Sequence, residues 1–334
     1  MQIIYIVYID YINSTYIIDK IYIVKITKME YRKLQITGKS TFVISIPKEW
    51  IKRNNLRKGD ILQIEEVGNA LMIRIGKDRG REEKIEIKDE DKMALSRLLI
   101  TKYIQGYDTI DFVSNKFIEQ EKKNYLKRIS NFLIGMEPFG ETHNEIVFKM
   151  LMQEGIDLIS TIDRMYDMSF SSLRNIIRAI KNSDGINENF LRSIIEMDDE
   201  IDKFYFLVLR QLSSKYGADV TAWVQIVKSI ERLSDHIENI ASLLLKGEKI
   251  EYSRHYESLI MLYGQVMLAL RSQNPKIAEE VLSGVEKFRI EERKSLEKSL
   301  EKYDDNKRSI LINESLRRIG EYISDIAEGV INMH

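Results

Sequence analysis

The chain has 334 residues, more than one ordinary hydrophobic core accommodates, and this length predicts two or three domains. Its 44% hydrophobic and 31% charged residues are typical of folded soluble proteins, and the lack of cysteine excludes disulfides, zinc ribbons and thiolate chemistry. With no disulfides to maintain, a cytoplasmic location is expected. The net charge of −1 favours no class of partner, but residues 29–81 carry twelve lysines and arginines against six acidic residues, an excess that is common where proteins bind phosphate groups.

The first 28 residues are rich in isoleucine and tyrosine. Asp10 and Asp19 interrupt them before an uncharged run reaches the length of a membrane span. They also lack the basic start and the small-residue cleavage site of a signal peptide. Met29 stands immediately before the first clear pattern, so we interpret residues 1–28 as an extra segment that is either not native or disordered.

Residues 29–80 predict a small domain with the element order β-β-α-β-β. Pro47 suits the start of the helix, because its missing amide donor costs nothing in the first turn. A unit of this size buries too little surface to be stable alone, so a homodimer is expected. The predicted elements are strands at 30–37 and 41–46, a helix after Pro47, and strands at 61–66 and 71–75.

Three short motifs in this domain, G-K, S-I-P-K-E-W and N-L-R-K-G-D-I-L, follow one another between residues 38 and 62. In this order they resemble the SpoVT–AbrB (MazE-like) swapped-hairpin family. The resemblance implies an interlaced dimer that binds DNA through basic residues of the first strand and its loop. The alternative is that the dimer serves only to join two chains. The implied DNA-binding residues are Arg32, Lys33 and Lys39, with Lys52 and Arg53 as weaker candidates.

Residues 81–150 have a different sequence pattern, which predicts a small α+β linker module. No phosphate loop, metal-ligand spacing or nucleophile with a nearby base is visible in it, so a spacer and a ligand sensor both remain open. The predicted elements are a helix at 89–105, a strand at 107–113, a helix at 116–132, a turn at 135–141 and a strand at 145–148.

Residues 151–334 have apolar spacing typical of helices almost throughout. Residues 230–241 align with residues 316–327 at a shift of 86, which predicts two three-helix repeats, at 155–246 and 250–334. The fold class is therefore multidomain α+β: a swapped-hairpin β domain, an α+β module and tandem three-helix bundles. The six predicted helices are 156–182, 187–214, 218–246, 252–272, 276–302 and 306–332.

Carboxylates stand where apolar residues belong in the first repeat. Asp198 and Asp202 lie one turn apart within the apolar stripe of their helix, where an unpaired charge would be costly. Glu231 and Asp235 flank the stripe of the next helix. If the two helices pack together, the four carboxylates could form a site for a hard cation. For the second pair, a solvated edge paired with Lys228 is the alternative.

The runs E-M-D-D-E-I-D-K-F from Glu196 and I-E-R-L-S-D-H-I-E-N-I-A from Ile230 resemble the PhoU family. The resemblance implies two three-helix repeats, a Glu/Asp-x-x-x-Asp motif associated with metal clusters, and a role in regulating phosphate uptake. A MazE-like head on a PhoU-like body is similar to archaeal PhoU-related regulators. The implied ligands of a divalent or ferric ion are Asp198, Asp202, Glu231 and Asp235.

The second repeat departs from that motif. Arg317 stands in place of the glutamate and Glu321 in place of the aspartate, a pair better suited to a salt bridge than to metal binding. On the preceding helix only Glu292 falls within the apolar stripe. We therefore predict at most one good metal site, in the first repeat.

Together these features predict a non-enzymatic, phosphate-linked transcriptional or signalling regulator that binds DNA through its head and senses a metal or partner through its helical body. One alternative is a modulator of a phosphate transporter or of its signalling partner, with a head that only dimerises. A metal-dependent hydrolase is a second alternative, but no general acid or phosphate clamp is visible. The sequence identifies neither the operator, the signal nor the direction of regulation.

Overall fold

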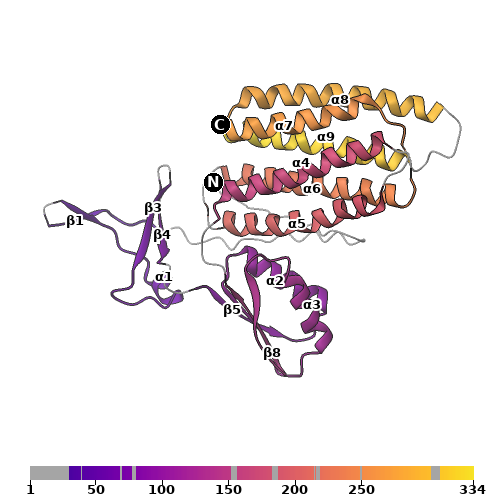
Figure 1. Ribbon diagram of the computed structural model, residues 1–334. Coiled ribbons are helices and arrows are strands. Elements are labelled where there is room, and N and C mark those ends of the chain that lie inside the picture. The colour runs from indigo at the N-terminus through magenta and orange to yellow at the C-terminus, as the bar shows by residue number, and fades with distance from the viewer. Residues whose placement is uncertain are drawn as a thin grey trace. The chain divides into compact units, whose positions relative to one another are not determined.

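Figure 1 shows the computed structural model of the protein, which describes most of the residues of each predicted domain. The predictions for residues 1–28 and for Lys39 fall outside the described residues. The described residues divide into two compact units, one ending at Gln63 and including Arg74–Gly76, the other containing Ile64–Ile73 and the chain from Gly80 onward. The described residues are 30–38, 40–67, 70–76, 80–151, 156–182, 187–213, 215, 219–248, 250–301 and 309–334.

The head has the predicted element order, with shorter strands than predicted. Strands β1 and β2 form an antiparallel hairpin, and Gly38 makes the turn after β1 with a φ of +71°, which glycine adopts without strain. Strands β3 and β4 form a second two-stranded sheet. The elements are β1 (Gln35–Thr37), β2 (Thr41–Val43), α1 (Lys48–Arg53), β3 (Leu62–Val67) and β4 (Ala70–Ile75).

The described residues of the head form no interior of their own. None of residues 30–38, 40–66 and 70–76 is buried. Ile36 and Phe42 face each other across the β1–β2 hairpin, yet their exposed fractions are 65% and 61%. So much exposed apolar surface on so small a unit is unusual for a domain that is monomeric in water. The other large apolar side chains left exposed here are Tyr31, Leu34, Val43, Ile44, Ile61, Ile64, Leu71 and Ile75.

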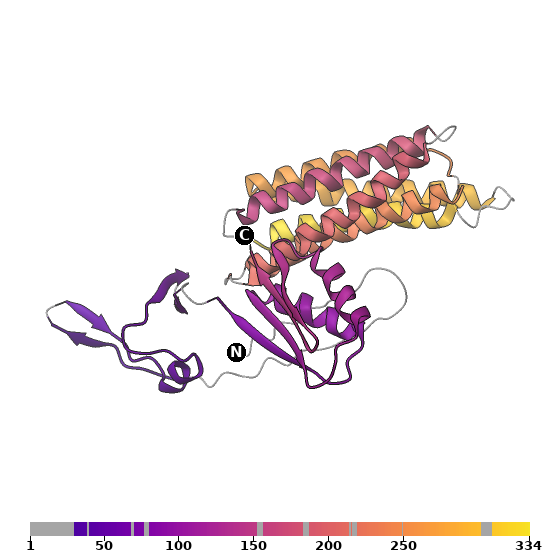
Figure 2. The ribbon, with the colours of Figure 1, turned by 60° about the horizontal axis from the view of Figure 1, so that its bottom comes forward.

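The middle module is a four-stranded sheet in the order β5-β6-β8-β7, packed against two helices (Figure 2). Strands β5 and β6 are parallel, and the other two pairs are antiparallel. Buried side chains of β6 alternate with less buried ones, as expected when helices cover one face of a sheet. The elements are β5 (Glu82–Ile87), α2 (Lys92–Ile104), β6 (Thr109–Ser114), α3 (Gln120–Ser130), β7 (Met136–Thr142) and β8 (Glu145–Met150).

One prediction for this module was wrong, and one strand was not predicted. Residues 135–141, expected to form a turn, lie mostly in the edge strand β7, which pairs with β8. An edge strand tolerates Pro138, and the register shifts between Pro138 and Gly140. Strand β5 had no predicted counterpart. The predicted helices and the other two strands of the module are confirmed.

The C-terminal region contains the six predicted helices, in the predicted order. Asp157 caps the first of them by accepting a hydrogen bond of 3.0 Å from the amide of Ser160. The six helices share one continuous hydrophobic core, and α6 packs against both α5 and α9. The helices are α4 (Leu158–Lys181), α5 (Glu188–Ser213), α6 (Asp219–Leu245), α7 (Glu257–Ser272), α8 (Pro275–Glu301) and α9 (Ser309–Ile331), with a 3-10 turn at Arg254–Tyr256 before α7.

Arg210 of α5 joins the bundle to the middle module. Its guanidinium donates to the carbonyl oxygens of Tyr103 and Tyr107, both at 2.8 Å, and to Asp108 Oδ1 at 2.7 Å. Tyr103 lies in the last turn of α2, and Tyr107 lies just beyond the turn that follows this helix. None of the helices that the structure describes is long and apolar enough to cross a membrane.

Candidate metal centre

Two neighbouring helices supply the acidic residues of the first repeat. Asp198 and Asp202 lie one turn apart on α5, and Glu231 and Asp235 lie one turn apart on α6. Helices α5 and α6 pack against each other, so the two pairs meet at one interface. The predicted convergence of these four carboxylates follows from this packing.

Three of the four carboxylates form a compact cluster. Asp202, Glu231 and Asp235 each place one oxygen so that the three atoms lie within 4.8 Å of one another. Asp198 lies next to this cluster, close enough for its charge to act on Asp202 and Asp235. Glu231 is 2% exposed, so the alternative of a solvated edge is wrong, although its pairing with Lys228 is present.

Burial and mutual repulsion shift these carboxylates toward their neutral form. Burial raises the pKa of Asp198 to about 7, and the Ser234 hydroxyl beside it opposes the shift. Burial, together with the charges of Asp198 and Glu231, raises the pKa of Asp202 to about 8. The pKa of Asp235 is raised by burial and then by the same neighbouring charges. A cluster of this kind accommodates either protons or an added cation.

The residues present fit a metal ion. Among the described residues, Oδ1 of Asp198 and Oδ1 of Asp235 are buried and accept no hydrogen bond, which is costly unless something else occupies the space beside them. The donor set consists of carboxylate oxygens, which suit hard cations. Asp202, Glu231 and Asp235 would hold the ion, with Asp198 alongside, and the ion would offset the negative charge that remains beside the one ammonium group of Lys228.

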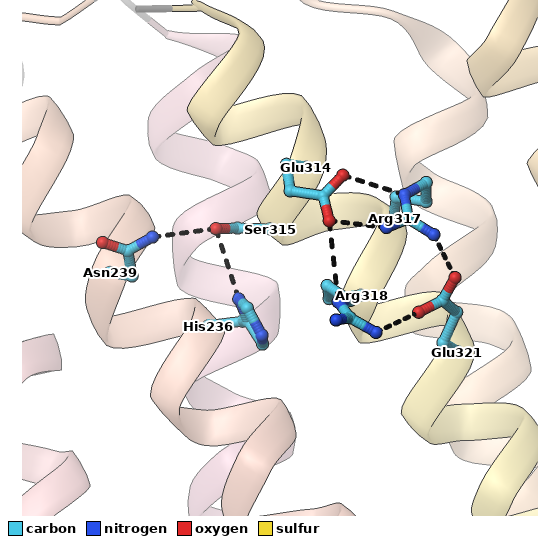
Figure 3. A network of polar contacts seen from close by, with 7 residues as sticks. All are labelled: His236, Asn239, Glu314, Ser315, Arg317, Arg318 and Glu321. Atoms are coloured by element: carbon cyan, nitrogen blue, oxygen red, sulfur yellow. Dashed lines mark hydrogen bonds and ion pairs between the residues drawn. The ribbon is translucent and has the colours of Figure 1, made fainter. Parts of the chain in front are cut away.

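The corresponding position of the second repeat holds an internal salt-bridge network instead (Figure 3). Arg317 of α9 forms a salt bridge with Glu321, as predicted, and its Nε lies 2.9 Å from Glu314 Oε2. Arg318 donates to Glu321 at 2.8 Å. Two guanidinium groups thus neutralise the two carboxylates that the structure describes at this position, so these carboxylates do not form a second acidic cluster.

His236 of α6 lies beside this network (Figure 3). Its Nδ1 is 3.3 Å from the hydroxyl of Ser315, to which Asn239 also donates at 2.9 Å. Its ring stacks on Tyr322 with centroids 5.7 Å apart. Burial, reinforced by the charge of Arg318, lowers the pKa of His236 to about 4, so the ring is neutral at physiological pH.

Glu292, the acidic residue in the apolar stripe of α8, has a partner that the sequence did not reveal. Glu292 is 3% exposed, and its Oε2 lies 2.7 Å from His255 Nε2. The other ring nitrogen of His255 lies 2.5 Å from the hydroxyl of Ser253. The only signal in the sequence was an acidic residue within an apolar stripe, which called for a partner to compensate its burial.

The predicted DNA-binding residues lie on the surface of the head. Arg32 and Lys33 are exposed and precede β1 rather than lying within it, and Arg32 forms an ion pair with Glu30. Lys52 and Arg53 are exposed in the last turn of α1. The geometry therefore leaves these cations accessible.

Comparisons with known proteins match two separate parts of the chain. Residues 162–244 match the model of the PhoU domain, and residues 35–81 match the model of the antidote-toxin recognition protein MazE, a bacterial antitoxin. The uncharacterized protein MJ1641 of Methanocaldococcus jannaschii is 23% identical over 239 residues, which are 69% of this chain and 75% of that protein.

Two solved structures are similar to part of this chain. PhoU from Pseudomonas aeruginosa has a TM-score of 0.47 and 19% identity, over 52% of this chain and 94% of that one. The phosphate transport system regulatory protein PhoU from Streptococcus pneumoniae has a TM-score of 0.46 and 14% identity, over 52% of this chain and 91% of that one.

A head without an interior, an α+β module and a bundle with a buried acidic cluster define a multidomain α+β protein built around a helical repeat. The two matching domain models make the class more specific. The chain is a PhoU-like protein with an N-terminal MazE-like domain.

Proposed function

We propose that this protein is a cytoplasmic, non-enzymatic regulator linked to phosphate, in which a dimeric head binds DNA and the helical bundle senses a metal ion or a partner protein. The observation that carries the proposal is the presence of a MazE-like and a PhoU-like domain on one chain. A domain of the first kind serves DNA binding or dimerisation, and a domain of the second kind serves phosphate-related regulation. On one chain, they would couple sensing by the helical bundle to DNA binding by the head.

DNA binding by the head is supported by its exposed cations and tested by their removal. Purified protein should bind duplex DNA with an affinity that falls steeply with salt, because phosphate contacts release counterions. The double variant Arg32→Ala/Lys33→Ala should bind more weakly, with a salt slope that is lower by about 1 for each cation that no longer touches a phosphate. Lys181→Ala/Arg192→Ala removes two exposed cations of the bundle and should leave binding unchanged. A gel shift over a range of salt concentrations makes the comparison.

A modulator of a phosphate transporter or of its signalling partner, with a head that only dimerises, is the second candidate. It is favoured by local ion pairs in the head, such as Arg32 with Glu30 and Lys52 with Glu49, which reduce the charge offered to DNA. Wild-type protein that ignores duplex DNA of any sequence at low salt would select this candidate. If wild-type protein does bind duplex DNA, mapping of bound genomic DNA with and without excess phosphate would separate a phosphate-linked regulator from one that responds to another signal.

Metal sensing in the first repeat rests on the acidic cluster and is tested by metal analysis. Wild-type protein should bind one metal ion per chain at the cluster. The variant Asp198→Ala/Asp202→Ala removes both acidic residues of α5 and should lose that ion. Glu314→Ala/Glu321→Ala removes two acidic residues of the second repeat as a control and should retain it. Equal metal content in wild type and in the α5 variant would remove the metal from the proposed function.

A further inference from the structure

The acidic cluster already contains a cation that belongs to the protein. Lys228 lies on α6, one turn before Glu231, and its ammonium nitrogen is 3.0 Å from Oε2 and 3.1 Å from Oε1 of Glu231. Oε1 of this most buried member of the cluster accepts a hydrogen bond from the ammonium group, and Oε2 lies within ion-pair distance of it.

The ammonium group acts on the whole cluster. Its positive charge opposes the rise in the pKa of Asp202 and of Asp235, so its field reaches both of the other ligand candidates. It also lies 5.1 Å from the centre of the Tyr205 ring, a cation–π contact that positions it between α5 and α6. Lys228 thus lies beside the three candidate ligands.

The ammonium group of Lys228 can move away from the carboxylates without unfolding of the helix. The side chain of Lys228 is 22% exposed, whereas that of Glu231 is 3% exposed, so a rotation of the flexible stem carries the ammonium into water while the carboxylate stays. In the second repeat, Arg317 is held by Glu314 and Glu321 together, an arrangement that fixes the guanidinium in place. The two repeats therefore differ in whether their internal cation is free to be displaced.

We propose that Lys228 is a resident cation of the first repeat, which occupies the metal position through Glu231 in the metal-free protein and is displaced when a divalent cation binds. This inference rests on the metal-sensing part of the proposed function. A metal ion and the ammonium group compete for the carboxylate of Glu231 and repel each other. Lys228 therefore sets the metal concentration at which the cluster fills.

The test is a titration with Mn²⁺ alone, a hard divalent cation whose free concentration is measured by electron paramagnetic resonance. Lys228→Met removes the charge and keeps an apolar stem against Tyr205, and Lys228→Gln is a second neutral variant. Lys228→Arg keeps the charge. Lys181→Met removes one positive charge from α4, where Lys181 pairs with Glu257, and is the matched control.

Both neutral variants should bind Mn²⁺ at least about tenfold more tightly than wild type, which corresponds to about 1.4 kcal/mol. Lys228→Arg and the Lys181→Met control should bind no more tightly than wild type. In wild-type protein, saturation with Mn²⁺ should also increase the rate at which Lys228 is methylated by formaldehyde and borohydride, followed by mass spectrometry. This last measurement does not depend on any variant folding correctly.

The outcomes separate this inference from the proposed function. If the neutral variants bind Mn²⁺ and wild type does not, Lys228 is a resident cation that the metal does not displace, and both displacement and metal sensing by the wild-type protein are refuted. If wild type binds Mn²⁺ but the neutral variants bind it no more tightly and methylation of Lys228 is unchanged, the inference is overturned and metal sensing stands. Absence of binding in every protein overturns both.

Discussion

At the scale of single residues, burial determines how four carboxylates coexist between α5 and α6. Asp198 and Asp202 have pKa values raised to about 7 and about 8, so at neutral pH much of their charge is removed by protons. Glu231 is paired with Lys228 instead. The metal-free cluster is therefore held together by protons and one ammonium group, and each of these is a cation that a metal ion can replace.

The metal-free protein should lose stability as the pH rises. A carboxyl whose pKa is higher in the folded than in the unfolded chain binds more protons when folded, so its stabilising effect, full below the unfolded value of about 4, is lost as the pH rises through the folded value. In the presence of a chelator, the melting temperature should fall by about 3–8 °C between pH 6 and pH 9. Asp202→Asn should flatten this dependence, and Glu196→Gln, an exposed change on the same helix, should not. Thermal unfolding followed by circular dichroism makes the measurement.

Part of this site was predictable from the sequence. Asp198 and Asp202 interrupt an apolar stripe, and that position alone indicated buried acids that needed compensation. Their periodicity could not show that Asp198 lies beside the cluster of three rather than in it, because helical spacing does not give the offset between two helices. His255 was missed for a related reason, since its partner Glu292 lies 37 positions further along the chain.

At the scale of elements, the helices were predicted better than the strands. Long apolar periodicities gave all six helices of the bundle, with ends that differ by a few residues from those observed. The short strands β5 and β7 were missed. Pro138 and Gly140 are typical turn residues, so local composition predicts a turn where β7 lies. Only the pairing of β7 with β8 shows that it is an edge strand. Pairing between strands distant in sequence is not visible in local composition.

The contact between α6 and α9 depends on a glycine. A Cβ on Gly329 of α9 would lie 2.6 Å from Cγ1 of Ile226 and 3.1 Å from its Cδ1, so one of the helices would have to shift. Gly329→Ala should lower the free energy of unfolding by about 1–2 kcal/mol, because overpacking outweighs the gain in helix propensity. Gly264→Ala on α7 meets its nearest atom at 3.8 Å and should instead raise that free energy by up to about 1 kcal/mol. Urea unfolding of both variants tests the pair, and equal effects would contradict the packing argument.

At the scale of the whole molecule, the exposed apolar surface of the head calls for a covering partner, and we expect a second copy of the same head to be that partner. The helical bundle has a core of its own, whereas the described residues of the head have none. We therefore expect self-association of the chain to take place through the head.

Phe42→Asp should weaken dimerisation of the full chain at least about tenfold, because Phe42 is 61% exposed and a charge there could not be buried at an interface. Phe139→Asp is the matched control, since Phe139 is 60% exposed but lies in the middle module. Sedimentation equilibrium at several protein concentrations gives both dissociation constants. Equal weakening by the two variants, or none by Phe42→Asp, would place the interface elsewhere.

The unbroken core of the bundle has a consequence for the way it melts. Side chains from all six helices belong to one cluster, so neither repeat can open without exposing apolar surface of the other. The bundle should therefore unfold in one cooperative calorimetric transition rather than in two, with a calorimetric enthalpy equal to the van't Hoff enthalpy. A cation bound in the first repeat would thereby raise the melting temperature of the second repeat, although the acidic residues described at the corresponding position there are taken up by arginines.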